Sequence, residues 1–137
     1  MTKEIWLNLP VKDVQLSKQF FSAIGFAFNE ARSGGTDMAC MLAGEKKTVV
    51  MLIQEDMFKG FSQNPLTETS KSSEILISYD AESPEEVEEI AKKVEAAGGI
   101  VFAKPAVSHG WMYGCAFCDP DGHRWNVLHM DFSKMPK

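Results

Sequence analysis

Residues 74–100 of the chain have the sequence EILISYDAESPEEVEEIAKKVEAAGGI. Its first residues are rich in the apolar and aromatic types that favour a β-strand, which we expect over residues 74–79. Ser83 is a suitable helix N-cap, Pro84 fits the first helical position, and Glu86 completes a capping box. The apolar positions that follow recur at helical spacing: Val87, Ile90, Ala91 and Val94. The stretch therefore predicts a strand followed by an amphipathic helix.

Three strand-like runs follow this helix, which we expect to end at Gly98-Gly99. They cover residues 100–103, 111–118 and 124–130, with a tight turn at 119–122 between the last two. The same order occurs upstream: a strand over 5–11, a helix capped by Asp13 and stopped by Gly25, and strands over 26–31, 37–42 and 48–53. Each half is therefore predicted to be a β-α-β-β-β unit.

A duplicated β-α-β-β-β unit predicts an α+β fold in which the two modules form an eight-stranded half-barrel with a concave cup. We assign residues 1–137 to a single domain, with a first module over about 1–54, a connector over 55–72 and a second module over about 73–137. The connector shows no clean period. Its Phe58 and Phe61 suggest that it packs down, and connectors of this length are often functional lids.

The composition limits the classes of partner. A net charge of −5 argues against nucleic acid or an anionic membrane. No apolar run approaches the roughly 20 residues of a membrane span, and no signal-peptide region precedes the first strand. An odd count of 3 cysteines in a chain of this size favours a reducing compartment. We therefore expect a cytoplasmic protein with a small-molecule partner.

Two motifs resemble those of a known superfamily. Leu9-Pro10-Val11-Lys12-Asp13, followed by Phe20-Phe21 and Ile24-Gly25-Phe26, is similar to the opening strand and helix of vicinal-oxygen-chelate proteins, which include glyoxalases, bleomycin resistance proteins and extradiol dioxygenases. Cys118-Asp119-Pro120-Asp121-Gly122-His123 resembles their turn before the last strand. The resemblance implies a glyoxalase-like fold, often homodimeric. It does not identify a substrate, because this fold supports many activities.

The resemblance also implies where a metal would bind. Metal-dependent members take ligands from the first and last strands of each half, and those positions fall on Trp6, Met51, Glu74 and Asn126. Only Glu74 is an ordinary ligand for a hard or borderline divalent ion. We therefore expect no metal and no other cofactor. The alternative is a divalent metal held by Glu74 and residues outside this set.

Each of these four positions has a second interpretation. Trp6, Met51 and Asn126 are also consistent with simple filling of the cup. If Glu74 faces the cup, its carboxylate is costly to bury unless it serves as a general base or binds a cation. If Glu74 faces water, it is an ordinary surface residue.

Other residues are candidates for the pocket wall. His109 and Trp111 lie in a predicted loop that can form the rim, and Tyr113 can add an aromatic surface, although a structural or surface role is the simpler interpretation for the histidine. Cys115 and Cys118 have redox-motif spacing. In a strand, however, an odd separation places their sulfurs on opposite faces.

We therefore expect a protein that binds a small organic ligand in an apolar cup without a catalytic metal. The cup would be lined by Trp6, Met51, Glu74 and Asn126. The first alternative is a metal-dependent lyase, isomerase or dioxygenase. The second is an interaction module whose cup is filled by its own side chains.

Overall fold

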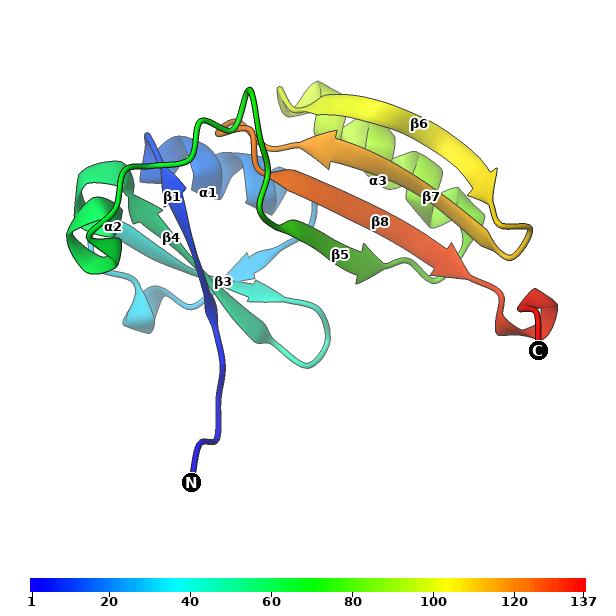
Figure 1. Ribbon diagram of the computed structural model, residues 1–137, viewed down its shortest axis with the longest axis horizontal. Helices are drawn as coiled ribbons and strands as arrows, with labels where there is room; N and C mark the ends of the chain where they lie inside the picture. The colour runs from blue at the N-terminus through cyan, green and yellow to red at the C-terminus, as the bar shows by residue number, and fades with distance from the viewer. The chain divides into compact units, whose positions relative to one another are not determined.

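The computed structural model describes residues 1–137 and divides into two compact units, Met1–Glu68 and Thr69–Lys137. Each unit contains a four-stranded sheet and a helix between its first two strands. The predicted α+β class with two tandem β-α-β-β-β modules is confirmed. Neither sheet closes on itself, because each has two edge strands (Figure 1).

The first unit consists of β1 (Leu7–Val11), α1 (Val14–Ala23), β2 (Ala27–Phe28), β3 (Met38–Ala43), β4 (Thr48–Gln54) and α2 (Glu55–Ser62). Its strand order is β1-β4-β3-β2, in which β1 runs parallel to β4 and the other pairs are antiparallel. A short 3-10 helix, Glu30–Arg32, replaces the end of the strand that we predicted over 26–31. The Asn29 side chain caps this turn by accepting from the Ala31 N–H, which ends the extended backbone.

Helix α1 begins and ends as the sequence predicts. The Asp13 carboxylate accepts hydrogen bonds from the backbone N–H groups of Gln15 and Leu16, at 3.0 and 3.2 Å. Gly25 follows the helix with φ of 110°, a conformation that strongly favours glycine. Phe20 and Phe21 are buried in an edge-to-face contact with ring centroids 5.1 Å apart. They form the apolar centre of this unit.

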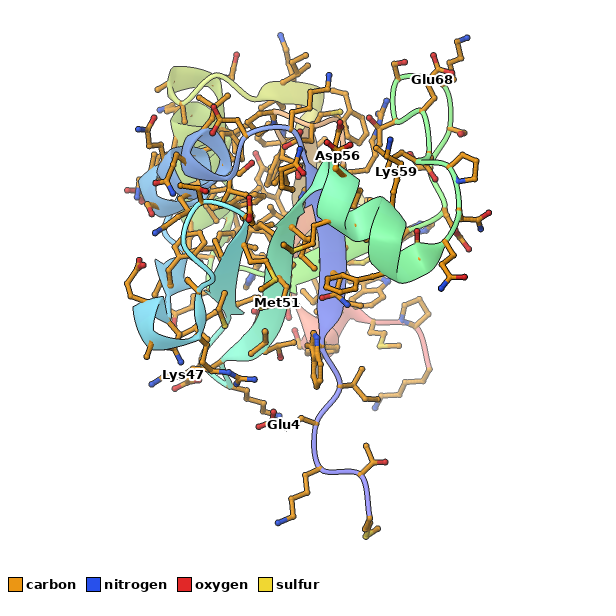
Figure 2. All side chains as sticks on the ribbon, turned by 90° about the vertical axis from the view of Figure 1, so that its left-hand side faces the viewer. Glu4, Lys47, Met51, Asp56, Lys59 and Glu68 are labelled. Carbon is orange, nitrogen blue, oxygen red and sulfur yellow. The ribbon has the colours of Figure 1, made fainter.

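Helix α2 lies within the predicted connector and was not expected from the sequence. The Gln54 side chain caps it by accepting from the Asp56 N–H at 2.9 Å, and Lys59 lies 3.6 Å from the Asp56 carboxylate one turn later (Figure 2). The helix packs against β1 and β4. Phe58 is half-buried, whereas Phe61 is 68% exposed, so only one of the two phenylalanines packs down.

The second unit consists of β5 (Leu76–Asp80), α3 (Pro84–Ala96), β6 (Ile100–Ser108), β7 (Met112–Cys118) and β8 (Arg124–Met130), followed by a 3-10 turn, Phe132–Lys134. Its strand order, β5-β8-β7-β6, repeats that of the first unit. Helix α3 lies along β6 and β7 (Figure 1). No helix in the structure is long and apolar enough to cross a membrane.

The predicted cap of α3 is confirmed with one change. Ser83 Oγ accepts from the Glu86 N–H at 3.1 Å, while the Glu86 carboxylate accepts from the N–H of Glu82, one residue before the cap. All four apolar positions predicted for this helix are buried. They pack on a sheet face that includes Phe117 and Trp125, whose rings stack at 6.3 Å with an interplanar angle of 3°.

Candidate functional site

The turn between β7 and β8 is organised by one buried carboxylate, that of Asp119. Its Oδ1 accepts from the backbone N–H groups of Asp121 at 2.9 Å and His123 at 3.0 Å, and its Oδ2 accepts from Trp125 Nε1 at 3.1 Å. Burial raises the pKa of Asp119, while the charge of His123 and the hydrogen bonds from the Trp125 side chain and the His123 backbone oppose the shift. The turn fixes where β8 starts and therefore which of its residues face each side of the sheet.

The two faces of the second sheet have different surroundings. Cys115 lies against α3, with its sulfur 4.0 Å from the carbonyl oxygen of Val87, and burial raises the pKa of its thiol to about 11. Successive strand residues point to opposite faces, so Arg124 and Asn126 lie on the face away from α3. We call this the open face. Strand pairing places eight residues on it in two rows: Ile100, Cys118, Arg124 and Leu76, then Ala103, Ala116, Asn126 and Ser78.

Asn126 and Ser78 form a polar pair on the open face. They are register partners on β8 and β5, and Asn126 Nδ2 donates to Ser78 Oγ at 3.3 Å. This bond uses one amide hydrogen and leaves the Asn126 carbonyl oxygen and the Ser78 hydroxyl proton for other partners. The same row continues with Ala116 on β7 and Ala103 on β6. Both side chains are short, so this row carries no long side chain on β6 or β7.

The first row contains a cation, the Arg124 guanidinium, which lies on an aromatic ring. The Arg124 guanidinium lies 4.3 Å from the centroid of the Phe102 ring. Phe102 is the extra residue of a β-bulge, since Val101 pairs with Phe117 while Ala103 pairs with Ala116. The exposed apolar side chains around the cation are Leu76, at 55% exposure, and Ile100, at 66%.

The candidates in the first unit lie on or beside its sheet. Met51 is half-buried on β4, opposite Asn8 of β1 and Cys40 of β3 in the register (Figure 2). Trp6 precedes β1 and is 48% exposed.

The strand register places Leu76, rather than Glu74, at the position that corresponds to Trp6. Trp6 lies seven residues before Asp13, the N-cap of α1, and the residue seven before Ser83, the N-cap of α3, is Leu76. The sheets agree: Trp6 lies two residues before the register partner of Met51, and Leu76 lies two before Ser78, the partner of Asn126. Glu74 lies outside β5, exposed in a bend.

The aromatic and histidine candidates divide between two places. His109 is exposed in the β6–β7 turn with φ of 55°, and Trp111 contacts the Phe132 ring at 5.9 Å. Tyr113 lies on the α3 side of the sheet, where its hydroxyl hydrogen-bonds to Glu88 and where this bond raises the pKa of the phenol. Because Tyr113 and Asn126 lie on opposite faces, we leave Tyr113 out of the candidate site.

The donor set does not fit the divalent metal that the fold implies. With Leu76 in place of Glu74, the four positions supply an indole, a thioether, an alkyl group and an amide already bonded to Ser78. No group of three or more His, Cys, Asp or Glu side chains is arranged to hold a metal ion.

Comparison with known proteins gives the family. Residues 3–44 match the model of the bleomycin resistance protein-like N-terminal family. A hypothetical protein from S. aureus is 38% identical, with 93% of this chain and 94% of that chain covered and a TM-score of 0.83. The chain belongs to the vicinal-oxygen-chelate superfamily.

More distant members of the superfamily share its fold. A glyoxalase/bleomycin resistance protein/dioxygenase family enzyme from Burkholderia phytofirmans has a TM-score of 0.79 at 16% identity, covering 91% of this chain and 96% of that one. A glyoxalase-related enzyme from Fulvimarina pelagi has a TM-score of 0.78 at 16% identity, covering 93% of this chain and 88% of that one. No curated protein matches the chain.

Sequence reasoning missed Leu76, Ser78, Arg124 and Phe102. Counting back from Ser83 identifies Leu76, and strand parity places Arg124 on the same face as Asn126. Nothing in the sequence marks Phe102, because the position of a bulge depends on strand pairing.

Proposed function

We propose that this vicinal-oxygen-chelate protein binds a small organic ligand on the open face of its second sheet, without a catalytic metal. The observation that carries the proposal is the character of that face. Exposed apolar side chains from β5 and β6 lie in the row next to a directional polar pair, Asn126 and Ser78. Small-molecule sites in proteins typically combine apolar walls with a few fixed polar groups.

The donor set supports the metal-free part of the proposal. A catalytic divalent ion needs three or so oxygen, nitrogen or thiolate ligands, and the four family positions offer none that is charged. We further propose that the protein is a cytoplasmic homodimer that acts by reversible capture of the ligand. Glu74, exposed beside β5, then contributes no essential contact.

Calorimetric titration of protein purified without added metal tests the proposal, with nickel, zinc, manganese and iron(II) as titrants. A fragment screen by two-dimensional amide NMR follows. We expect no saturable metal binding and fragment-induced shifts at the amides of Ser78 and Asn126. Tight, near-stoichiometric metal binding would instead support a metal-dependent lyase, isomerase or dioxygenase.

A further inference from the structure

We propose that the ligand of the open face is a small organic anion with a planar apolar body, whose negative group is bound by Arg124. This inference rests on the proposed function and specifies the charge of the ligand. Three independent features of the second unit support it: the state of the guanidinium, the bulge beside it, and the hydrogen-bonding groups in the next row.

The Arg124 guanidinium has no acidic partner. No carboxylate of the chain forms an ion pair with it, and its guanidinium lies over the Phe102 ring. The side chain is nevertheless half-buried. A guanidinium carries five N–H donors in a rigid fork that matches the two oxygens of a carboxylate. A partly desolvated fork without an anion is suited to binding one from solution.

The β-bulge at Phe102 holds this cation in place. The extra residue turns the phenylalanine ring toward Arg124, and stacking on a ring fixes the plane of a guanidinium while leaving its edge available for hydrogen bonds. The ring is 45% exposed, so it also presents apolar surface beside the charge. The bulge thus brings a charge and an aromatic wall together.

The neighbouring row and Leu76 provide the remaining contacts. Asn126 is two residues from Arg124 on the same strand and the same face. Its register partner Ala116 has a short side chain, so little protein covers the sheet surface there. Leu76, the register partner of Arg124, supplies exposed apolar surface on the β5 side. A flat ring placed over the small residues contacts apolar side chains while its acidic group meets Arg124.

Three probes that share one ring system test the charge. Labelled protein is titrated with 1-naphthoate, 1-naphthalenemethanol and 1-naphthylmethylamine, and the amide signals of Ser78, Arg124 and Asn126 are followed by NMR. Because hydrogen bonds to charged groups are roughly twice as strong as neutral ones, we expect naphthoate to bind about tenfold more tightly than the alcohol. We expect the amine to bind more weakly than the alcohol.

Variants separate the guanidinium from the rest of the face. Arg124→Met should remove the preference for naphthoate while the alcohol still binds, and Arg124→Lys should retain part of it, because the charge remains but the fork is lost. Lys92→Met is the matched control. It removes an exposed cation from α3, which lies on the other side of the sheet, and should leave all three affinities unchanged.

The outcomes distinguish the two proposals. If none of the probes shifts these amides, ligand binding on the open face is refuted along with its charge preference. If the alcohol or the amine binds as tightly as naphthoate, the proposed function stands and the anionic ligand is rejected. The same conclusion follows if Arg124→Met keeps the full preference while its spectrum shows a folded protein.

Discussion

Two turns occupy equivalent places in the two units, and they are built differently. The β3–β4 turn of the first unit, at Gly44–Lys47, is exposed and closed by a backbone hydrogen bond from the Lys47 N–H to the Gly44 carbonyl oxygen at 3.0 Å (Figure 2). The β7–β8 turn of the second unit is closed around the buried Asp119 carboxylate. The β3–β4 turn only reverses the chain direction. The β7–β8 turn also forms a hydrogen bond to a core residue, Trp125.

The difference affects how firmly each unit holds the strand that follows its turn. In the second unit, the turn anchors Trp125 beneath the sheet and thereby fixes Arg124 and Asn126 above it. In the first unit, the corresponding position on β4 is Met51, opposite Asn8, and no carboxylate secures the strand start. We therefore expect the side chains at the start of β8 to be held more rigidly than those at the start of β4.

The largest effect should come from Asp119→Ala. The change removes the acceptor for three N–H groups, one of them the buried indole of Trp125, and an unsatisfied buried donor costs about 1–3 kcal/mol. We expect the free energy of unfolding to fall by about 3 kcal/mol in urea titrations. The control is Asp13→Ala, which removes an exposed helix cap and should cost about 1 kcal/mol. Equal losses would show that the buried turn has no special role.

An intermediate effect should distinguish Leu76 from Glu74. Leu76→Ser removes apolar surface from the open face, and we expect the affinity for 1-naphthoate to fall about fivefold, since burial of a leucine side chain is worth about 1.5–3 kcal/mol when complete. Glu74→Gln should leave that affinity unchanged. NMR titration measures both. The register assignment fails if the glutamate variant loses affinity and the leucine variant does not.

A smaller effect of opposite sign is expected at Lys47. This residue has φ of 57°, a left-handed conformation that costs a non-glycine residue about 1 kcal/mol. Lys47→Gly should therefore stabilise the protein by only a few tenths of a kcal/mol, after the greater flexibility of glycine in the unfolded chain is subtracted. Thermal unfolding with Thr48→Gly as the control checks the sign. A destabilised Lys47→Gly protein would contradict the expectation.

A further expected effect is a dependence of stability on alkaline pH. Burial raises the pKa of Cys115 from 9.0 to about 11, so the folded state holds this proton more tightly than the unfolded state. Its contribution to stability is complete below about pH 9 and is lost as the pH rises through about 11. Urea midpoints at pH 8 and pH 10.5 should therefore differ less in Cys115→Ala than in the unchanged protein. An identical difference in both proteins would remove Cys115 from the explanation.

The fold could be predicted from the sequence because its signals are local. Helix caps at Asp13 and Ser83, together with regular apolar spacing, mark the repeated order of elements. The connector helix α2 escaped prediction because it is short, contains Gly60 and leaves Phe61 exposed. Its stability comes from packing against β1 and β4, which no local pattern records.

The candidate site could be predicted only in part. Asn126 could be proposed from the sequence because it lies at a fixed distance from a recognisable turn. Leu76 was missed because side chains two residues apart on a strand lie on the same face. An error of two residues in the counting, which gave Glu74, therefore leaves the predicted face unchanged. The contact between Arg124 and Phe102 depends on a bulge, which only the paired strands define.

Side chains along β8 point alternately to the interior and to the open face, so a substitution and a change in chain length have different effects here. The interior side of this strand carries Trp125 and Val127, both buried. The opposite side carries Arg124 and Asn126. Exchanging the outward pair changes the chemistry of the open face without disturbing the interior. An inserted or deleted residue in the Asp119 turn, by contrast, reverses both sides at once. The outward residues of this strand can therefore be exchanged one at a time, whereas the length of the turn is fixed by the packing of the inward residues.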